Sequence, residues 1–291
     1  MRVFVTGASG WVGATVVRDL RAHGHEVLGL ARSDQGEMMA REAGAQVLRG
    51  TLDDLELLQQ AARDSDAVIH TAFNHDFSRF AENAAQDRRA IEAIGAALEG
   101  SDRMLLVTSG FAGLGAPGRL AQEEDSPATD FPRHSETAAQ ALAARGVRAG
   151  VVRLAPSVHG LGDHGFVPNL INLARSTGVS AWLGEGDNLW AGVHRLDAAK
   201  VYRLALEKGL PHAVYHAAGD EGVPFRAIAQ VIGRQLGIPA EARGPEHFGW
   251  FARFAGAEMG ASADRTRAAL GWEPTQPGLL ADLDQPGYYP A

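Results

Sequence analysis

The fold of this chain is decided by its N-terminal stretch, Arg2-Val3-Phe4-Val5-Thr6-Gly7-Ala8-Ser9-Gly10-Trp11-Val12-Gly13. A short apolar run leads into three glycines with the spacing Gly7-x-x-Gly10-x-x-Gly13, and a helical pattern follows directly. At a strand–loop–helix junction the first glycine permits a tight turn, the second lets the backbone approach a pyrophosphate, and the third allows close helix–strand packing. The start of the helix offers unpaired N–H groups to the phosphates. The stretch therefore predicts a dinucleotide-binding loop.

The rest of the first half alternates short apolar runs with longer helical patterns, which is typical of a parallel sheet built from βαβ units. We expect strands at residues 2–6, 26–31, 45–49, 67–71, 104–108 and 147–154, and helices at residues 12–23, 34–43, 55–62, 78–98 and 135–144. Later patterns predict helices at 167–176, 196–207 and 225–236 and a strand at 213–216. The predicted fold class is α/β: a Rossmann-type doubly wound parallel sheet in residues 1–154, with a smaller, mainly substrate-binding lobe in residues 155–291 from which some segments return to the Rossmann core.

The end of the second expected strand indicates which dinucleotide binds. An NAD site usually places Asp or Glu there to accept hydrogen bonds from the ribose 2′-hydroxyl. This chain instead has Arg32 and Ser33, which can pair with and donate to a 2′-phosphate; the alternative is that Arg32 is simply solvated. We therefore predict NADP(H) as the cofactor. Further expected cofactor contacts are Ser9, Trp11, Val12, Leu52, Asp53, Thr71, Ala72, Thr108 and Pro156.

Asp53 has two compatible interpretations. It follows the third expected strand, where an adenine contact is usual, and it precedes a helical pattern, so it is also a candidate N-cap.

The composition narrows the range of partners. Lys and Arg number 27 against 35 Asp and Glu, which gives a formal net charge of −8 and argues against nucleic acid and anionic membranes as partners. There is no cysteine, and the histidines show no zinc-binding spacing, so no metal site is expected.

The chain starts with an apolar strand and has no apolar run of about 18 residues. We expect a cytoplasmic protein with a small-molecule substrate.

Several motifs together resemble those of the extended short-chain dehydrogenase/reductases, the NAD(P)-dependent epimerase/dehydratase-like group. They are residues 6–13 as the nucleotide loop, residues 151–160 after the sixth strand, residues 184–188 and 193–199 in the substrate lobe, and residues 270–274 near the C-terminus. The resemblance covers most of the chain and implies the same two-part architecture.

The expected active site departs from that group. Its members usually carry a Tyr-x-x-x-Lys pair on the helix after the fifth strand, where the tyrosine exchanges a proton with the substrate. Here no tyrosine precedes Tyr202 and no lysine precedes Lys200. Aligning the usual Ser-Lys with Ser135-Glu136 places Pro132 at the tyrosine position and Glu136 at the lysine position. The chain thus resembles an atypical member that lacks the pair.

Other side chains must then polarise the substrate or supply a proton, and histidine is the natural substitute near neutral pH. The candidates, all near the carboxyl ends of expected strands or the start of the expected helix, are Ser109, His134, His75 and His159. Structural alternatives exist: Ser109 as a turn cap, His134 as an exposed residue beside an N-cap at Ser135, and His75 as a loop residue.

Three functions fit these observations. The leading one is an NADPH-dependent oxidoreductase that reduces a small-molecule ketone, imine or activated alkene with a non-tyrosine proton donor. The alternatives are a non-catalytic NADP(H)-sensing regulatory or interaction protein, and an epimerase or dehydratase of the nucleotide-sugar type. The alanine-rich patterns at 78–98 and 135–144 also favour a homodimer, because alanine allows helices to approach closely.

Overall fold

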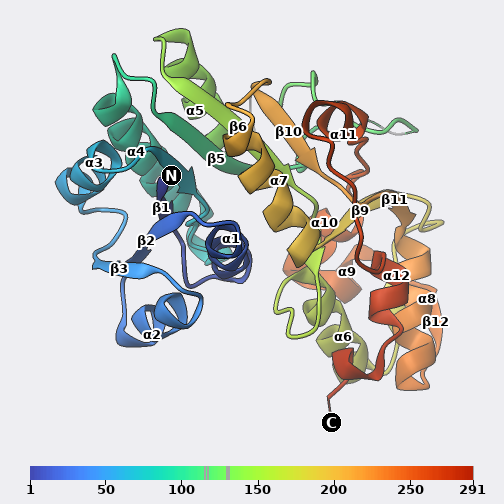
Figure 1. Ribbon diagram of the computed structural model, residues 1–291. Coiled ribbons are helices and arrows are strands. Elements are labelled where there is room, and N and C mark those ends of the chain that lie inside the picture. Colours follow the sequence, from blue (N-terminus) through green and yellow to red (C-terminus); the bar gives the residue numbers. More distant parts are fainter. Residues whose placement is uncertain (115, 117, 129–131, 291) are drawn as a thin grey trace.

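The central sheet of the protein contains seven parallel strands in the order β10-β6-β5-β4-β1-β2-β3. The computed structural model describes residues 1–114, 116, 118–128 and 132–290 (Figure 1). The strands are β1 Arg2–Thr6, β2 Glu26–Ala31, β3 Gln46–Arg49, β4 Ala67–His70, β5 Met104–Gly110, β6 Arg148–Leu154 and β10 Val214–Ala217. The strand order reverses between β1 and β4, which is where open α/β sheets bind ligands.

Helices cover both faces of this sheet, each over its own apolar core. One face carries α1 (Trp11–Ala22), α2 (Asp34–Glu42) and α7 (Arg195–Glu207), and the other carries α3 (Leu55–Arg63), α4 (Phe80–Leu98) and α5 (Ser135–Ala144) (Figure 1). Successive side chains of a strand point to opposite faces. Val3 and Val5 accordingly join the first core, while Phe4 joins the second.

The remaining chain forms a second, smaller lobe beside the carboxyl edge of the sheet. Its sheets are β11-β9-β7 and β12-β8, formed by β7 Ser157–His159, β8 Ser180–Trp182, β9 Leu189–His194, β11 Asp220–Pro224 and β12 Ala240–Ala242. Its helices are α6 Phe166–Thr177, α8 Phe225–Leu236, α9 Pro245–Phe248, α10 Ala252–Ala255 and α12 Leu279–Leu283. Helix α11 Asp264–Leu270 instead returns to the central sheet, where it packs against β10 and α7. The 3₁₀ turns of the chain are η1 Phe77–Arg79, η2 Gly249–Phe251 and η3 Pro286–Tyr288. The lobe is built on aromatic packing, with the Trp190 and Phe225 ring centroids 5.0 Å apart.

These elements confirm the predicted α/β class and the predicted order of strands and helices. Two of the differences in boundaries have clear local causes. The helix expected at 78–98 begins at Phe80, because Asp76 accepts a hydrogen bond from the Ser78 N–H (3.0 Å) and starts a separate 3₁₀ turn. Strand β5 extends to Gly110 because Ser109 and Gly110 still pair with β6. No helix within the described ranges is long and apolar enough to span a membrane.

Candidate active site

The loop between β1 and α1 requires glycine at its first and third glycine positions. Gly7 has φ +70°, and a Cβ added there would lie 2.8 Å from the Ala72 backbone nitrogen. A Cβ at Gly13 would collide with the Gly7 carbonyl oxygen. The N-cap of α1 is Gly10, which has no side chain to occupy the first N–H groups of the helix. The loop therefore fits a pyrophosphate, because its backbone can approach the phosphates and its N–H groups remain available to them.

The side chain of Trp11 joins this loop to the second lobe. Its Nε1 donates to the Val158 carbonyl oxygen (2.7 Å), and the Arg195 guanidinium lies 4.1 Å from the ring centroid. The indole N–H is thereby committed to the second lobe, and a cofactor contact by Trp11 remains a prediction.

Arg32 is exposed at the carboxyl end of β2 and forms no ion pair with any described residue. The nearest following acid, Asp34, is paired with Arg49 at 2.8 Å. Ser33 is the N-cap of α2, and its Oγ accepts a hydrogen bond from the Gly36 N–H (3.1 Å). Since that bond uses only the oxygen, the hydroxyl hydrogen of Ser33 remains free to donate. The end of β2 thus presents a cation and a donor without a carboxylate facing them.

The interpretation of Asp53 as an N-cap requires correction. The N-cap of α3 is Asp54, whose Oδ2 accepts from the backbone N–H of Thr51 at 2.7 Å. Asp53 instead accepts a hydrogen bond from Gln86 Nε2 (2.5 Å). An adenine contact by Asp53 remains a prediction.

Three catalytic candidates lie at the carboxyl edge of the sheet. Ser109 is buried near the end of β5, opposite Arg153 of β6. His75 lies in the segment after β4, and His134 is the half-buried N-cap of α5. The alternative that Ser135 caps this helix is wrong, because Ser135 is its first residue and its hydroxyl donates to Asp87 Oδ2 (2.5 Å).

His75 is held in its neutral form at physiological pH. Although the residue keeps solvent exposure, surrounding protein desolvates its ring, and this is the first cause of its lowered pKa. The positive charge of Arg133 and the neighbouring His164 lower the pKa of His75 further. Phe73 packs against the ring at 5.3 Å between centroids. A hydrogen bond with the Phe73 backbone acts in the opposite direction but does not reverse the lowering of the pKa, so His75 is a poor cationic acid.

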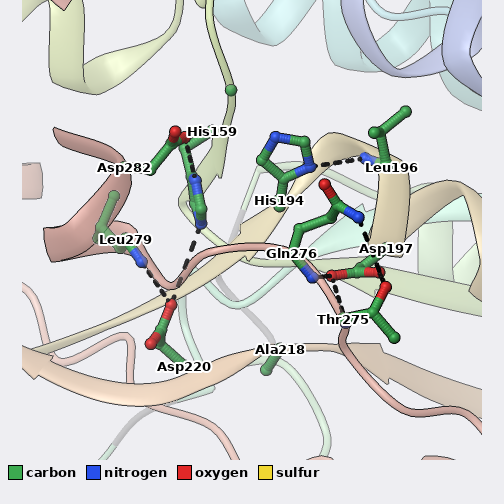
Figure 2. Close-up of polar contacts among 12 residues, drawn as sticks. His159, His194, Leu196, Asp197, Ala218, Asp220, Thr275, Gln276, Leu279 and Asp282 are labelled. Atoms are coloured by element: carbon green, nitrogen blue, oxygen red, sulfur yellow. Dashed lines mark hydrogen bonds and ion pairs between the residues drawn. The ribbon is translucent and has the colours of Figure 1, made fainter. Parts of the chain in front are cut away.

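His159 is not accessible to a substrate in this structure. It is fully buried between Asp282 and Asp220 (Figure 2), with Nδ1 2.8 Å from Asp282 Oδ2 and Nε2 4.0 Å from Asp220 Oδ2. Its position in the sequence predicted a place beside the substrate. The short strand β7, however, directs the ring into the second lobe, where it connects β7 to α12.

Asp197 explains why two of the quoted motifs occur together. It is buried at the start of α7, and its Oδ2 accepts from the backbone N–H groups of Thr275 and Gln276, both at 2.9 Å (Figure 2). Trp272 Nε1 donates to the Asp197 carbonyl oxygen (3.0 Å). The motifs at 193–199 and 270–274 therefore fasten the C-terminal segment to the fold.

Glu136, for which the sequence predicted the usual lysine position, is buried. It forms a two-bond ion pair with Arg153, with Nε to Oε2 at 2.8 Å and Nη2 to Oε1 at 2.5 Å, and both side chains are buried. Arg153 Nη1 also donates to His216 Nε2 (3.0 Å). Burial first, and the charge of Arg153 second, lower the pKa of His216 to about 4. Glu136 is thus part of a buried structural network.

Tyr202 does not replace the missing tyrosine. It is fully buried on α7, and its hydroxyl lies 2.9 Å from Thr108 Oγ1. Burial raises its pKa, which is opposite to what a proton-exchanging tyrosine needs near neutral pH. Thr108, predicted to contact the cofactor, directs its hydroxyl to this contact below the sheet edge.

Arg133 is the notable residue of this region that sequence reasoning missed. It lies just before α5, one position after Pro132, and it is half-buried. Its Nε donates to Ser135 Oγ (2.8 Å), its Nη2 donates to the Thr108 carbonyl oxygen (3.0 Å), and its guanidinium lies 4.3 Å from the Phe73 ring centroid. The only sequence signal was its place beside the absent tyrosine.

The fold is of the Rossmann dinucleotide-binding type. Its glycine loop follows β1, the strand order reverses between β1 and β4, and polar side chains lie beyond β4 and β5. The chain belongs to the NAD dependent epimerase/dehydratase family, whose model matches residues 3–218. This confirms the resemblance drawn from the motifs. A nicotinamide dinucleotide is the cofactor class of the family.

Three individual comparisons illustrate the range of similar proteins. An uncharacterised protein of Schizosaccharomyces pombe is 45% identical over 99% of this chain and 100% of its own length. A 4-hydroxy-2-methyl-3-oxo-4-farnesyl-3,4-dihydroquinoline-1-oxide ketoreductase of Stigmatella aurantiaca is 30% identical over 83% of this chain and 75% of its own. The UDP-glucose 4-epimerase of Thermus thermophilus, solved in complex with NAD, has a TM-score of 0.76 at 21% identity, covering 99% of this chain and 98% of its own.

Proposed function

We propose that this protein is an NADPH-dependent reductase of a small-molecule ketone, imine or activated alkene. The observation that carries the cofactor choice is Arg32, an exposed guanidinium without an ion-pair partner among the described residues, next to the free hydroxyl hydrogen of Ser33. A 2′-phosphate would give both groups a partner. The similar ketoreductase of Stigmatella aurantiaca supports reduction as the reaction.

Different residues would bind the cofactor and act on the substrate. The loop from Gly7 to Gly13 would hold the pyrophosphate, and Arg32 the 2′-phosphate. The bound dinucleotide supplies the hydride. Ser109, His134 and neutral His75 are the proposed side chains that orient the acceptor and deliver a proton, because they lie at the same sheet edge.

Two other functions remain candidates on specific observations. The burial of Glu136 against Arg153 leaves no standard proton-exchanging pair and favours a non-catalytic NADP(H)-sensing protein. Family membership favours an epimerase or dehydratase. The three differ in their use of the cofactor: a reductase consumes NADPH in proportion to product, an epimerase or dehydratase returns the hydride within one turnover, and a sensor consumes none.

The cofactor choice is tested by measuring NADPH and NADH affinities of Arg32→Ala. We expect the Kd for NADPH to rise about tenfold or more with the Kd for NADH unchanged, because only NADPH loses a charge-assisted contact. Arg49→Ala is the matched control, since Arg49 ends the neighbouring strand and already pairs with Asp34. Equal effects of Arg32→Ala on both cofactors would refute the assignment.

The reaction is tested by following NADPH absorbance with a panel of ketones, imines and activated alkenes. Stoichiometric NADPH loss with product supports the reductase. Cofactor binding without any consumption across the panel contradicts it.

A further inference from the structure

We propose that Arg133 is the substrate-binding cation of this site and that the substrate is anionic, carrying a carboxylate next to its reducible group. That the substrate has a reducible group rests on the proposed reductase function, whereas the anion site rests on the contacts of Arg133 alone.

The guanidinium of Arg133 is fixed along one edge and open along another. Its two hydrogen bonds run from Nε to Ser135 and from Nη2 to Thr108. They use the side edge of the guanidinium, which is formed by Nε and Nη2. The Phe73 ring covers one face at 4.3 Å. Nη1 and the second hydrogen of Nη2 have no partner among the described residues. These two nitrogens form the end edge, which matches the two oxygens of a carboxylate.

The charge of Arg133 is only partly compensated by the protein. No carboxylate of the described residues lies within ion-pair distance of it. Asp87 acts on it at longer range and is reached through the Ser135 hydroxyl. Burial would raise the pKa of Asp87, but its contact with His70, the charge of Arg133 and its hydrogen bond with Ser135 together lower that pKa. The carboxylate oxygens themselves are used by His70 and Ser135.

Desolvation makes this arrangement costly without a ligand. Burial lowers the pKa of Arg133, although its guanidinium remains charged at any physiological pH. A half-buried cation with an open fork is stabilised when an anion completes it, and that anion then gains more from the contact than it would in water.

The surroundings of Arg133 reinforce the preference for an anion. His75 and His164 lie close enough to interact electrostatically, and the His164 ring contacts Trp11 at 5.6 Å between centroids. Arg195 stacks on the other part of Trp11, and its buried Nε has no partner among the described residues. The acid in this loop is Asp163, whose pKa burial raises and whose Oδ1 accepts from the Gly165 N–H. The fixed positive charge of this region therefore comes from Arg133 and Arg195, and Asp163 is the acid of the loop.

The position of Arg133 separates it from the cofactor phosphates. It lies next to Pro132, the residue at the tyrosine position, and contacts Thr108 at the end of β5. The phosphate loop lies at β1, with β4 between it and β5 in the sheet. Arg133 is thus placed to bind the substrate, and its fork would orient an oxo acid through the carboxylate.

The first test is calorimetric titration of the protein, saturated with NADP+, with oxamate and with oxamide. Oxamate carries the carboxylate of a 2-oxo acid, and oxamide is its neutral counterpart. We expect wild type to bind oxamate at least about tenfold more tightly than oxamide, and Arg133→Met to remove the difference. Arg133→Lys keeps the positive charge but not the planar guanidinium, and we expect it to lose part of the preference for oxamate over oxamide. Arg88→Met, which removes an exposed arginine paired with Glu92, is the matched control and should behave as wild type.

The second test compares NADPH oxidation with 2-oxo acids and with their methyl esters. With 2-oxo acids, such as pyruvate against methyl pyruvate, the carboxylate lies next to the ketone as the proposal requires. We expect these acids to have the lower KM, and Arg133→Lys to raise KM for acids more than for esters. Reduction of esters as readily as acids would leave the reductase intact and overturn the anionic substrate. Arg133-dependent oxamate binding without any turnover would sustain the anion site and overturn the reductase. Equal binding of oxamate and oxamide, or no binding of either, overturns the inference.

Discussion

Restoring the family's lysine by Glu136→Lys is expected to destabilise this protein rather than activate it. The substitution places a second cation against Arg153 in a region where both native side chains are buried, at 2% and 1% exposure. Arg153 is held in place by carbonyl oxygens of Gln122, Glu123 and Asp125 as well as by Glu136, so it has little freedom to turn away.

The expected magnitude follows from this burial. Removing one partner of a buried ion pair costs about 3–5 kcal/mol, because the remaining charge is left uncompensated. Glu136→Lys adds repulsion to that loss. At about 2 °C per kcal/mol for a chain of this size, Tm should fall by roughly 6–10 °C or more. Glu136→Gln, which keeps an acceptor for Arg153, should lie between this value and wild type.

The assay is differential scanning calorimetry, with urea unfolding as a second readout. The control is Glu82→Lys, which breaks the exposed pair between Arg79 and Glu82 and should cost no more than about 1 kcal/mol. Equal Tm values for the two lysine variants would refute the reasoning. So would restored activity in the double substitution Pro132→Tyr with Glu136→Lys at unchanged Tm.

Three further outcomes are expected. Gly13→Ala should abolish dinucleotide binding, since its Cβ collides with the Gly7 carbonyl oxygen; fluorescence titration with unchanged Kd would contradict this. His216, with a pKa lowered to about 4, contributes stability that is full above its unfolded value of about 6.5 and is lost as pH falls toward 4, by about 3 kcal/mol. Urea unfolding at pH 7 and pH 4.5 should therefore show a smaller pH loss for His216→Gln than for wild type, and parallel losses would argue against it. If the outer face of α5 forms a dimer interface, Ala141→Arg at its exposed surface should convert a dimer to a monomer in light scattering; a wild-type monomer rules the dimer out.

The structure agrees with the sequence where the physical cause is local. The glycine spacing, the apolar runs and the helix periodicity each depend on residues within one strand–loop–helix unit, and β1, β2, α5 and α8 begin and end where the sequence patterns place them. The absence of a Tyr-x-x-x-Lys pair is likewise a matter of reading the chain.

The candidate site was less predictable, because its side chains are oriented by distant partners. His159 looked like a substrate contact, yet Asp282, 123 residues away, holds it inside the second lobe. Arg133 had no motif to mark it, and its bonds to Thr108 and Ser135 arise only when β5 and α5 are packed together. No pattern along the chain records such pairings.

By itself, then, the sequence determined that the chain is a dinucleotide-binding α/β protein with arginine in place of the acid at the end of its second strand. These are properties of local spacing and residue type. Tertiary structure decided which polar groups are buried and which are open: it paired Glu136 with Arg153 inside the fold and left the end of the Arg133 fork without a partner among the described residues. Burial and charge compensation depend on packing between segments far apart in the chain, and only the folded arrangement brings those segments together.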